Sequence, residues 1–171
     1  MRNLFFMSLM LCATLLLGAE ARAQAPAPAQ VPEAMPYDIP FGRPITLEHA
    51  KKIAAAAQAE ARKHNWKMAI AVVEPSGDLV YFEKMDGTQY ASIKIAQGKA
   101  HAAAIFRRPT KIFADAANSG HPYVLGLEGA VTVDGGLPLV ENGKIIGAIG
   151  ASGGTSEQDA VVAKAGLDTI K

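Results

Sequence analysis

The most distinctive chemistry of the sequence lies in a glycine-rich loop near the C-terminus. An apolar run ends in Ser152-Gly153-Gly154-Thr155-Ser156, and a helical pattern follows it. The free N–H groups of such a loop and the positive end of the helix dipole favour an anion such as a carboxylate. A purely structural role fits equally well, in which Ser156 caps the helix and forms a capping box with Asp159. The candidate ligand-binding residues of the loop are Gly150, Ser152, Gly153, Gly154 and Ser156.

Lys99 is a second candidate, because it falls on the apolar stripe of a predicted helix over residues 90–106. Its stem can reach out to water, its ammonium group can pair with an acid on the sheet, or it can bind an anionic ligand. The opposite stripe of this helix carries Lys94, Gln97, His101 and Arg108, a pattern typical of ordinary solvated surface.

The four histidines are His49, His64, His101 and His121, and no pair has the helical spacing of a zinc site. A single imidazole beside an apolar slot is enough to ligate haem iron. Ser152 is not in a nucleophile-elbow pattern, since two glycines follow it. The residues therefore reveal no catalytic machinery and leave enzymatic activity open.

The N-terminal residues have the features of a targeting segment. Arg2 precedes an apolar run that ends near Gly18, and small-x-small motifs follow at Ala21-Arg22-Ala23 and Ala23-Gln24-Ala25. This is the pattern of a cleaved secretory signal over residues 1–23, and the run is shorter than a spanning helix needs. We therefore expect a periplasmic or secreted protein that has no membrane segment after cleavage. Cleavage also removes Cys12, the sole cysteine, and so excludes disulfides from the mature chain.

The composition supports one folded domain of about 127 residues, 45–171. A Pro/Ala-rich tether over residues 24–44 precedes it. Within this tether, Tyr37 to Phe41 is the part that we expect to pack on the domain. Half of the 171 residues are hydrophobic, and the formal net charge is only +1. This balance excludes wholesale disorder and gives no basic surface for nucleic acid.

The periodicity predicts helices near 47–65, 90–106, 110–117 and 157–170, with hairpins over 68–84 and 137–151. Within residues 124–134, Gly126 and Gly129 favour a loop that is followed by a short strand. Pro75-Ser76-Gly77-Asp78 and Asn142-Gly143 supply the hairpin turns. The order of the elements is typical of an α+β domain with a mainly antiparallel sheet.

Seven separated motifs in this order resemble the GlcG/HbpS-like family, which is related to the C-terminal domain of PduO. They include Leu47-Glu48-His49-Ala50, Gly98-Lys99-Ala100, Phe106-Arg107-Arg108-Pro109-Thr110 and Gly135-Gly136-Leu137-Pro138-Leu139. The resemblance implies a profilin-like fold with a five-stranded antiparallel sheet. It also implies homo-oligomers built from dimers, which the Ala-rich faces of the first and last helices would suit.

Two functional hypotheses follow from the residues and the resemblance together, and a purely structural role in an assembly stays open as a third interpretation. In the first, the exported protein binds haem, with His49 as axial ligand and Lys99 or Arg107 near the propionates. In the second, the protein binds or processes a small organic acid. The Gly150–Ser156 loop then holds the carboxylate, Lys99 is the counter-ion, and Asp86 or Glu83 acts as base.

Overall fold

The computed structural model describes residues 31–170, and its compact unit begins at Ala34. The predicted signal segment and the first part of the tether lie outside the described residues. Within residues 31–170, no helix is long and apolar enough to cross a membrane.

Four strands form one antiparallel sheet in the order β2-β1-β4-β3. The strands are β1 (Ala69–Val73), β2 (Leu79–Lys84), β3 (Gly136–Glu141) and β4 (Lys144–Ser152). Both predicted hairpins are present, because Gly77, Asn142 and Gly143 adopt the positive φ angles that their turns require. β1 and β4 are the two central strands and pair from Ala69↔Ser152 to Val73↔Ala148.

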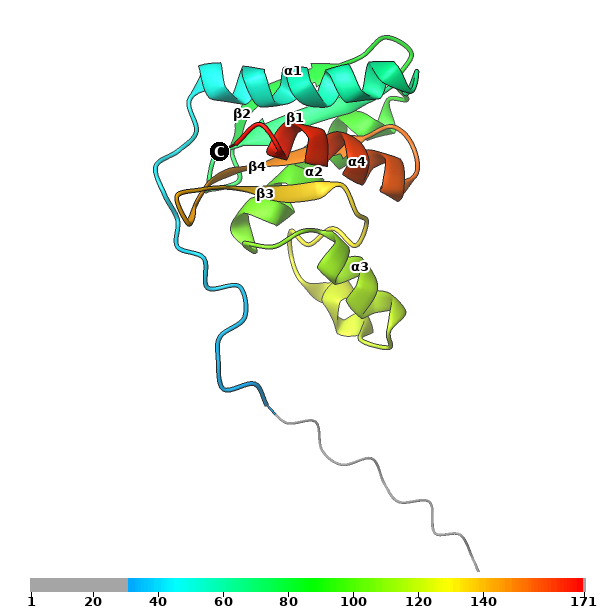
Figure 1. Cartoon of the computed structure of the whole chain (residues 1–171). Helices are drawn as coiled ribbons and strands as arrows, with labels where there is room; N and C mark the ends of the chain where they lie inside the picture. The colour runs from blue at the N-terminus through cyan, green and yellow to red at the C-terminus, as the bar shows by residue number, and fades with distance from the viewer. Residues whose placement is uncertain (1–30, 171) are drawn as a thin grey trace, which may run out of the picture. The chain divides into compact units, whose positions relative to one another are not determined.

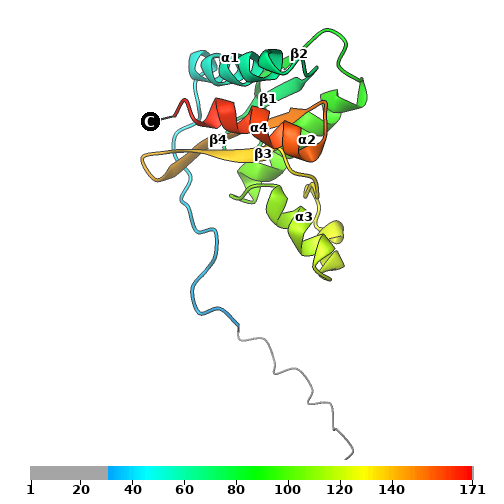
Figure 2. The same cartoon turned by 45° about the vertical axis from the view of Figure 1, so that its right-hand side comes forward.

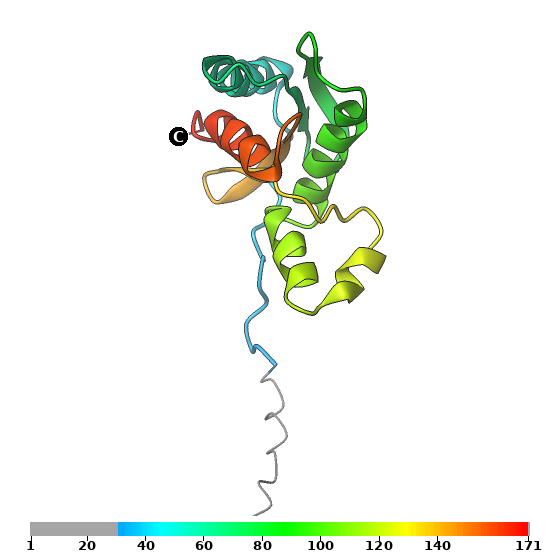
Figure 3. The same ribbon diagram turned by 90° about the vertical axis from the view of Figure 1, so that its right-hand side faces the viewer.

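Helices cover both faces of the sheet (Figure 1). α1 (Leu47–Lys63) and α4 (Ser156–Leu167) contact each other on one face, and α2 (Ala91–Ile105) crosses the other face over β4. Figure 3 shows the sheet between these two layers. α3 (Lys111–Asn118) and the 3₁₀ helix η1 (Pro122–Gly126) contact each other, and Figure 2 shows α3 beyond β3. The domain is therefore α+β, as the pattern predicts.

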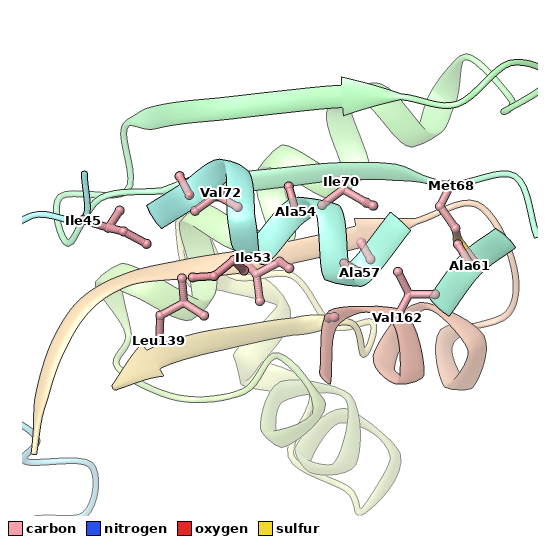
Figure 4. Close-up of a cluster of buried hydrophobic side chains, with 14 of the residues drawn as sticks. Ile45, Ile53, Ala54, Ala57, Ala61, Met68, Ile70, Val72, Leu139 and Val162 are labelled. Atoms are coloured by element: carbon pink, nitrogen blue, oxygen red, sulfur yellow. The ribbon is translucent and has the colours of Figure 1, made fainter. Parts of the chain in front are cut away.

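The larger part of the core lies between the sheet and the α1/α4 layer (Figure 4). Small side chains on α1 let it approach Ile70 and Val72 closely. These alanines, Ala50, Ala54, Ala57 and Ala61, are fully buried within the chain's own core. The expectation that the Ala-rich face of α1 serves a dimer contact is therefore wrong, since this face has no surface left to offer.

The expected fifth strand is absent from the described residues. Phe41 instead makes a single parallel bridge to Ile145, beside the start of β4. The N–H of Gly42 donates to Ile145 O at 2.7 Å, and the N–H of Ile145 donates to Pro40 O at 2.9 Å. Pro40 and Pro44 have no N–H groups, so the pairing cannot extend into a ladder. The strand expected within 124–134 is also absent, and η1 begins that stretch instead.

Candidate functional site

A groove of about 900 Å³ lies around His49, in the first turn of α1. Thr46 caps this helix by accepting a hydrogen bond from the His49 N–H at 3.2 Å, which fixes the start of the helix and leaves the half-buried imidazole in the groove. This volume falls within the range of small-molecule and cofactor sites. The lining residues are Phe41, Gly42, Arg43, Pro44, Ile45, Thr46, His49, Glu141, Asn142, Lys144 and Ile146.

Two segments far apart in the sequence form the walls of the groove. One is the chain from Phe41 to Ile45, held against β4 by backbone bonds that include Ile45 N–H to Ile146 O at 2.8 Å. The other is the β3–β4 turn. The walls meet closely at Gly42, where a Cβ would lie only 3.0 Å from the Cβ of Lys144. A larger residue at position 42 would therefore push the two walls slightly apart.

The groove combines one imidazole with charged and apolar groups. Ile45 and Ile146 supply a buried apolar floor, and the exposed side chains of Arg43 and Lys144 supply positive charge. Neither cation takes part in an ion pair within the described part of the chain, whereas Glu141 brings one negative charge to the same rim. Such a site suits a largely apolar ligand with anionic substituents.

Lys99 is paired inside the protein. Its side chain is fully buried, and Nζ donates to Asp159 Oδ2 at 2.7 Å and to Ala151 O at 3.1 Å. Gly135 makes room for the pair, because a Cβ at that position would lie 3.0 Å from Nζ. Of the roles open to Lys99, the structure selects an ion pair, although the acid lies on α4 rather than on the sheet. Lys99 does not line the His49 groove.

Several donors of the glycine-rich loop also have partners within the chain. Gly154 N–H donates to Asp159 Oδ1 at 3.0 Å, so this carboxylate lies where the sequence suggested an external anion. Ser152 Oγ donates to Ser92 Oγ at 3.2 Å. Gly150 and Gly153 permit close packing, since a Cβ on either would lie about 2.1 Å from a backbone oxygen of Ala96 or Lys67.

The helix cap differs from the expected one by one residue. Thr155 has extended backbone angles and is the N-cap of α4, so Ser156 is the first helical residue. Thr155 N–H donates to Gln158 Oε1 at 2.9 Å, and Gln158 N–H donates to Thr155 Oγ1 at 3.4 Å. The capping box therefore joins Thr155 and Gln158, and the prediction of Ser156 with Asp159 is wrong, because Asp159 turns inward to Lys99.

Arg107 lies beside the groove wall rather than inside the groove. It follows α2 and has a backbone φ of +56°, in the left-handed region that residues other than glycine rarely adopt. Its Nη1 donates to Asp38 Oδ1 and to Ile39 O, both at 3.4 Å, and its guanidinium lies 5.7 Å from the ring centre of Phe41. The part of the tether that was expected to pack on the domain, Tyr37 to Phe41, does so here.

The two acids considered as bases lie on or after the edge strand β2. Tyr81 OH donates to Glu83 Oε2 at 3.0 Å, and this bond raises the pKa of Tyr81, as does partial burial. Glu83 Oε1 is buried and has no hydrogen-bond partner among the described residues. Asp86 is exposed in the turn that follows. Neither acid lines the groove, and residues 31–170 contain no cluster of three or more metal-ligating side chains.

The sequence singled out His49, which the structure places in the groove, but most of the residues around it were not predicted. Arg43 and Phe41 stand between prolines and resemble the rest of the tether, and Lys144 resembles the end of an ordinary turn. The available signal was the pattern Pro40-Phe41-Gly42-Arg43-Pro44, in which an aromatic residue and a glycine interrupt a proline-rich stretch.

Comparisons with known proteins agree with this architecture. A family model described as "Haem degrading protein HbpS-like" matches residues 45–168. Protein GlcG of Escherichia coli K12 is 40% identical over 108 residues, which are 63% of this chain and 81% of GlcG. A double mutant of HbpS from Streptomyces reticuli superposes with a TM-score of 0.71 at 28% identity, over 85% of this chain and 99% of HbpS.

A more distant structure, the complex of PduOC with heme, has a TM-score of 0.68 at 23% identity. The match covers 75% of this chain and 96% of PduOC. At this identity the likeness shows a shared fold.

Proposed function

Because the chain belongs to the family of HbpS-like haem-degrading proteins, we propose that it binds haem in the groove around His49. The observation that carries the proposal is the combination of a half-buried imidazole, an apolar floor and two unpaired cations in one groove of about 900 Å³. Haem needs one axial donor, an apolar slot and positive charge near its propionates.

Each part of the groove then has a role. His49 would be the axial ligand, and Arg43 and Lys144 would bind the propionates, in place of Lys99, whose charge Asp159 neutralises. Ile45 and Ile146 would exclude water from one face of the ring. Bound haem would supply an iron centre capable of one-electron chemistry. The PduOC–heme complex supports the proposal in that a domain of this fold can accommodate haem.

We test the proposal by titrating the purified protein with haemin and following the Soret band. A saturable shift at about one haem per chain is expected. His49→Ala should abolish the Soret shift that depends on an imidazole bound to the iron, since no other imidazole lines the groove. His64→Ala is the matched control, because this exposed histidine at the other end of α1 stacks on Trp66 and bonds to Glu60. A shift that survives His49→Ala would refute His49 as ligand, and no saturable shift in the unmodified protein would refute haem binding.

The cations have a separate readout. Arg43→Ala combined with Lys144→Ala should weaken haemin binding by about tenfold. This factor corresponds to the summed free energies of two partly exposed charge contacts. The Soret position should stay unchanged, because the axial ligand is intact. An unchanged affinity would exclude these two residues from the propionate site.

The remaining parts of the proposal concern location and assembly. The charged start, apolar run and small-residue motifs of residues 1–23 support export to the periplasm or the medium. Assembly into a homo-oligomer is supported by exposed apolar side chains on and after η1, where Tyr123 is 69% and Leu125 66% exposed. Monomeric proteins seldom expose neighbouring large apolar groups.

A further inference from the structure

A second hollow, of about 410 Å³, lies on the α2 side of the sheet and shares no lining residue with the His49 groove. Its walls are the β1–β2 turn, α2 and the chain at 129–131. Lys94, Gln97 and His101 recur every three or four residues along α2 and all face this hollow. Three of the four residues that the sequence pattern assigned to ordinary surface therefore line a pocket, whereas Arg108 lies over the Tyr37 ring.

His101 is held in a defined orientation within this pocket. Its Nδ1 lies 3.1 Å from Gly77 O, and because a carbonyl oxygen only accepts hydrogen bonds, Nδ1 carries the proton. The imidazole fits there because residue 77 is glycine, with φ +90°, and a Cβ would lie 2.3 Å from Nδ1. In the neutral ring Nε2 then keeps its lone pair for a donor from outside the chain.

The rim of the pocket carries opposite charges. Lys94 and Asp78 both line it and are both exposed, and neither forms an ion pair within the described residues. Ser76 Oγ donates to Asp78 Oδ2 at 2.8 Å, which holds this carboxylate in place. Val73 and Val131 also line the pocket and add apolar wall to it.

We propose that this pocket binds a small zwitterion, a free amino acid with a short apolar side chain. Its carboxylate would bind Lys94, and its ammonium group would donate to His101 Nε2 and Asp78. Its side chain would contact Val73 and Val131, and a volume of about 410 Å³ limits it to a small ligand. The inference is independent of haem, because the two sites share no residue.

The test is a titration of the full protein, without haem, followed by amide chemical shifts, with L-valine as the probe. Isobutylamine lacks the carboxylate and 3-methylbutanoate lacks the ammonium group, so both serve as matched ligands. L-valine should give saturable shifts at residues 94–101 and 129–131, and both analogues should bind about tenfold more weakly or not at all.

Variants assign the contacts. Lys94→Met and Asp78→Asn should each weaken L-valine binding by about tenfold, and both residues are exposed, so the fold should survive. Lys51→Met, an exposed lysine of α1 that lines neither hollow, should bind as the unmodified protein does. Absence of saturation with L-valine, equal binding of an analogue, or shifts located elsewhere would each overturn the proposal.

Discussion

The buried pair of Lys99 and Asp159 is the most consequential interaction at the level of single residues. Two charges without access to water are tolerated because each has further partners, namely Ala151 O for the ammonium and Gly154 N–H for the carboxylate. Removal of one partner strands the other charge in a medium that solvates it poorly. The pair thus ties α2, β4 and the start of α4 together.

Lys99→Met should destabilise the protein by about 3–5 kcal/mol, because the Asp159 carboxylate would remain buried without a counter-charge. The double variant Lys99→Met with Asp159→Leu should recover most of this loss, since it leaves no charge behind. Urea unfolding followed by circular dichroism measures both values. Lys164→Met is the control. Lys164 Nζ lies 2.6 Å from Asp168 Oδ1, but both side chains are exposed to solvent, and such surface ion pairs contribute little to stability. Equal losses in Lys99→Met and Lys164→Met would contradict this account.

The sequence predicted that Lys99 lies on an apolar helix stripe but could not identify its partner. Asp159 is 60 residues further along the chain, and its own position suggested a local capping role. Local spacing reports which face a side chain occupies, whereas a contact between distant elements depends on how those elements cross.

Among the elements, the segment from Tyr37 to Ile45, here named the strap, determines whether the groove has two walls. Arg108 stacks over the Tyr37 ring at 3.9 Å, and Arg107 contacts Asp38, Ile39 O and Phe41. Backbone bonds from Gly42 and Ile45 to β4 complete the attachment. The side chains of Arg107 and Arg108 therefore hold the strap against the domain.

The double variant Arg107→Ala with Arg108→Ala should release the strap while the sheet and the main core stay folded. Two cation–π contacts of about 0.5–1 kcal/mol each correspond to about tenfold more frequent opening. Hydrogen exchange at the amides of Gly42 and Ile45 should accelerate by that factor. Arg62→Ala, which removes only a bond to Gln58 on α1, is the matched control. Unchanged exchange would show that the backbone bonds alone hold the strap.

Helices and hairpins were predictable because their signals are local. Gly77 and Asn142-Gly143 mark the turns, and the apolar spacing after Thr46 marks α1. The strap was harder to predict, since its prolines suppress strand propensity and its order comes from contacts with residues far along the chain. The groove was equally hard to predict from the sequence, because the strap forms one of its two walls.

For the whole molecule, the exposed apolar side chains of Tyr123, Leu125 and Leu127, which lie within five residues of one another in sequence, predict association with a second copy. Light scattering coupled to size-exclusion chromatography should give a mass above that of one chain. Tyr123→Ser combined with Leu125→Ser should lower that mass towards a monomer. Val161→Ser, on an exposed site of α4, should leave it unchanged. A monomer in the unmodified protein would contradict the prediction, and dissociation by Val161→Ser would move the contact to α4.

The attachment of the strap also has a consequence for biosynthesis. During translation the strap emerges before every element that holds it, and Arg107 follows Asp38 only after 69 further residues. Ile145 comes later still, in β4. The strap therefore stays unattached until β4 has been made, and the His49 groove can form only after that point.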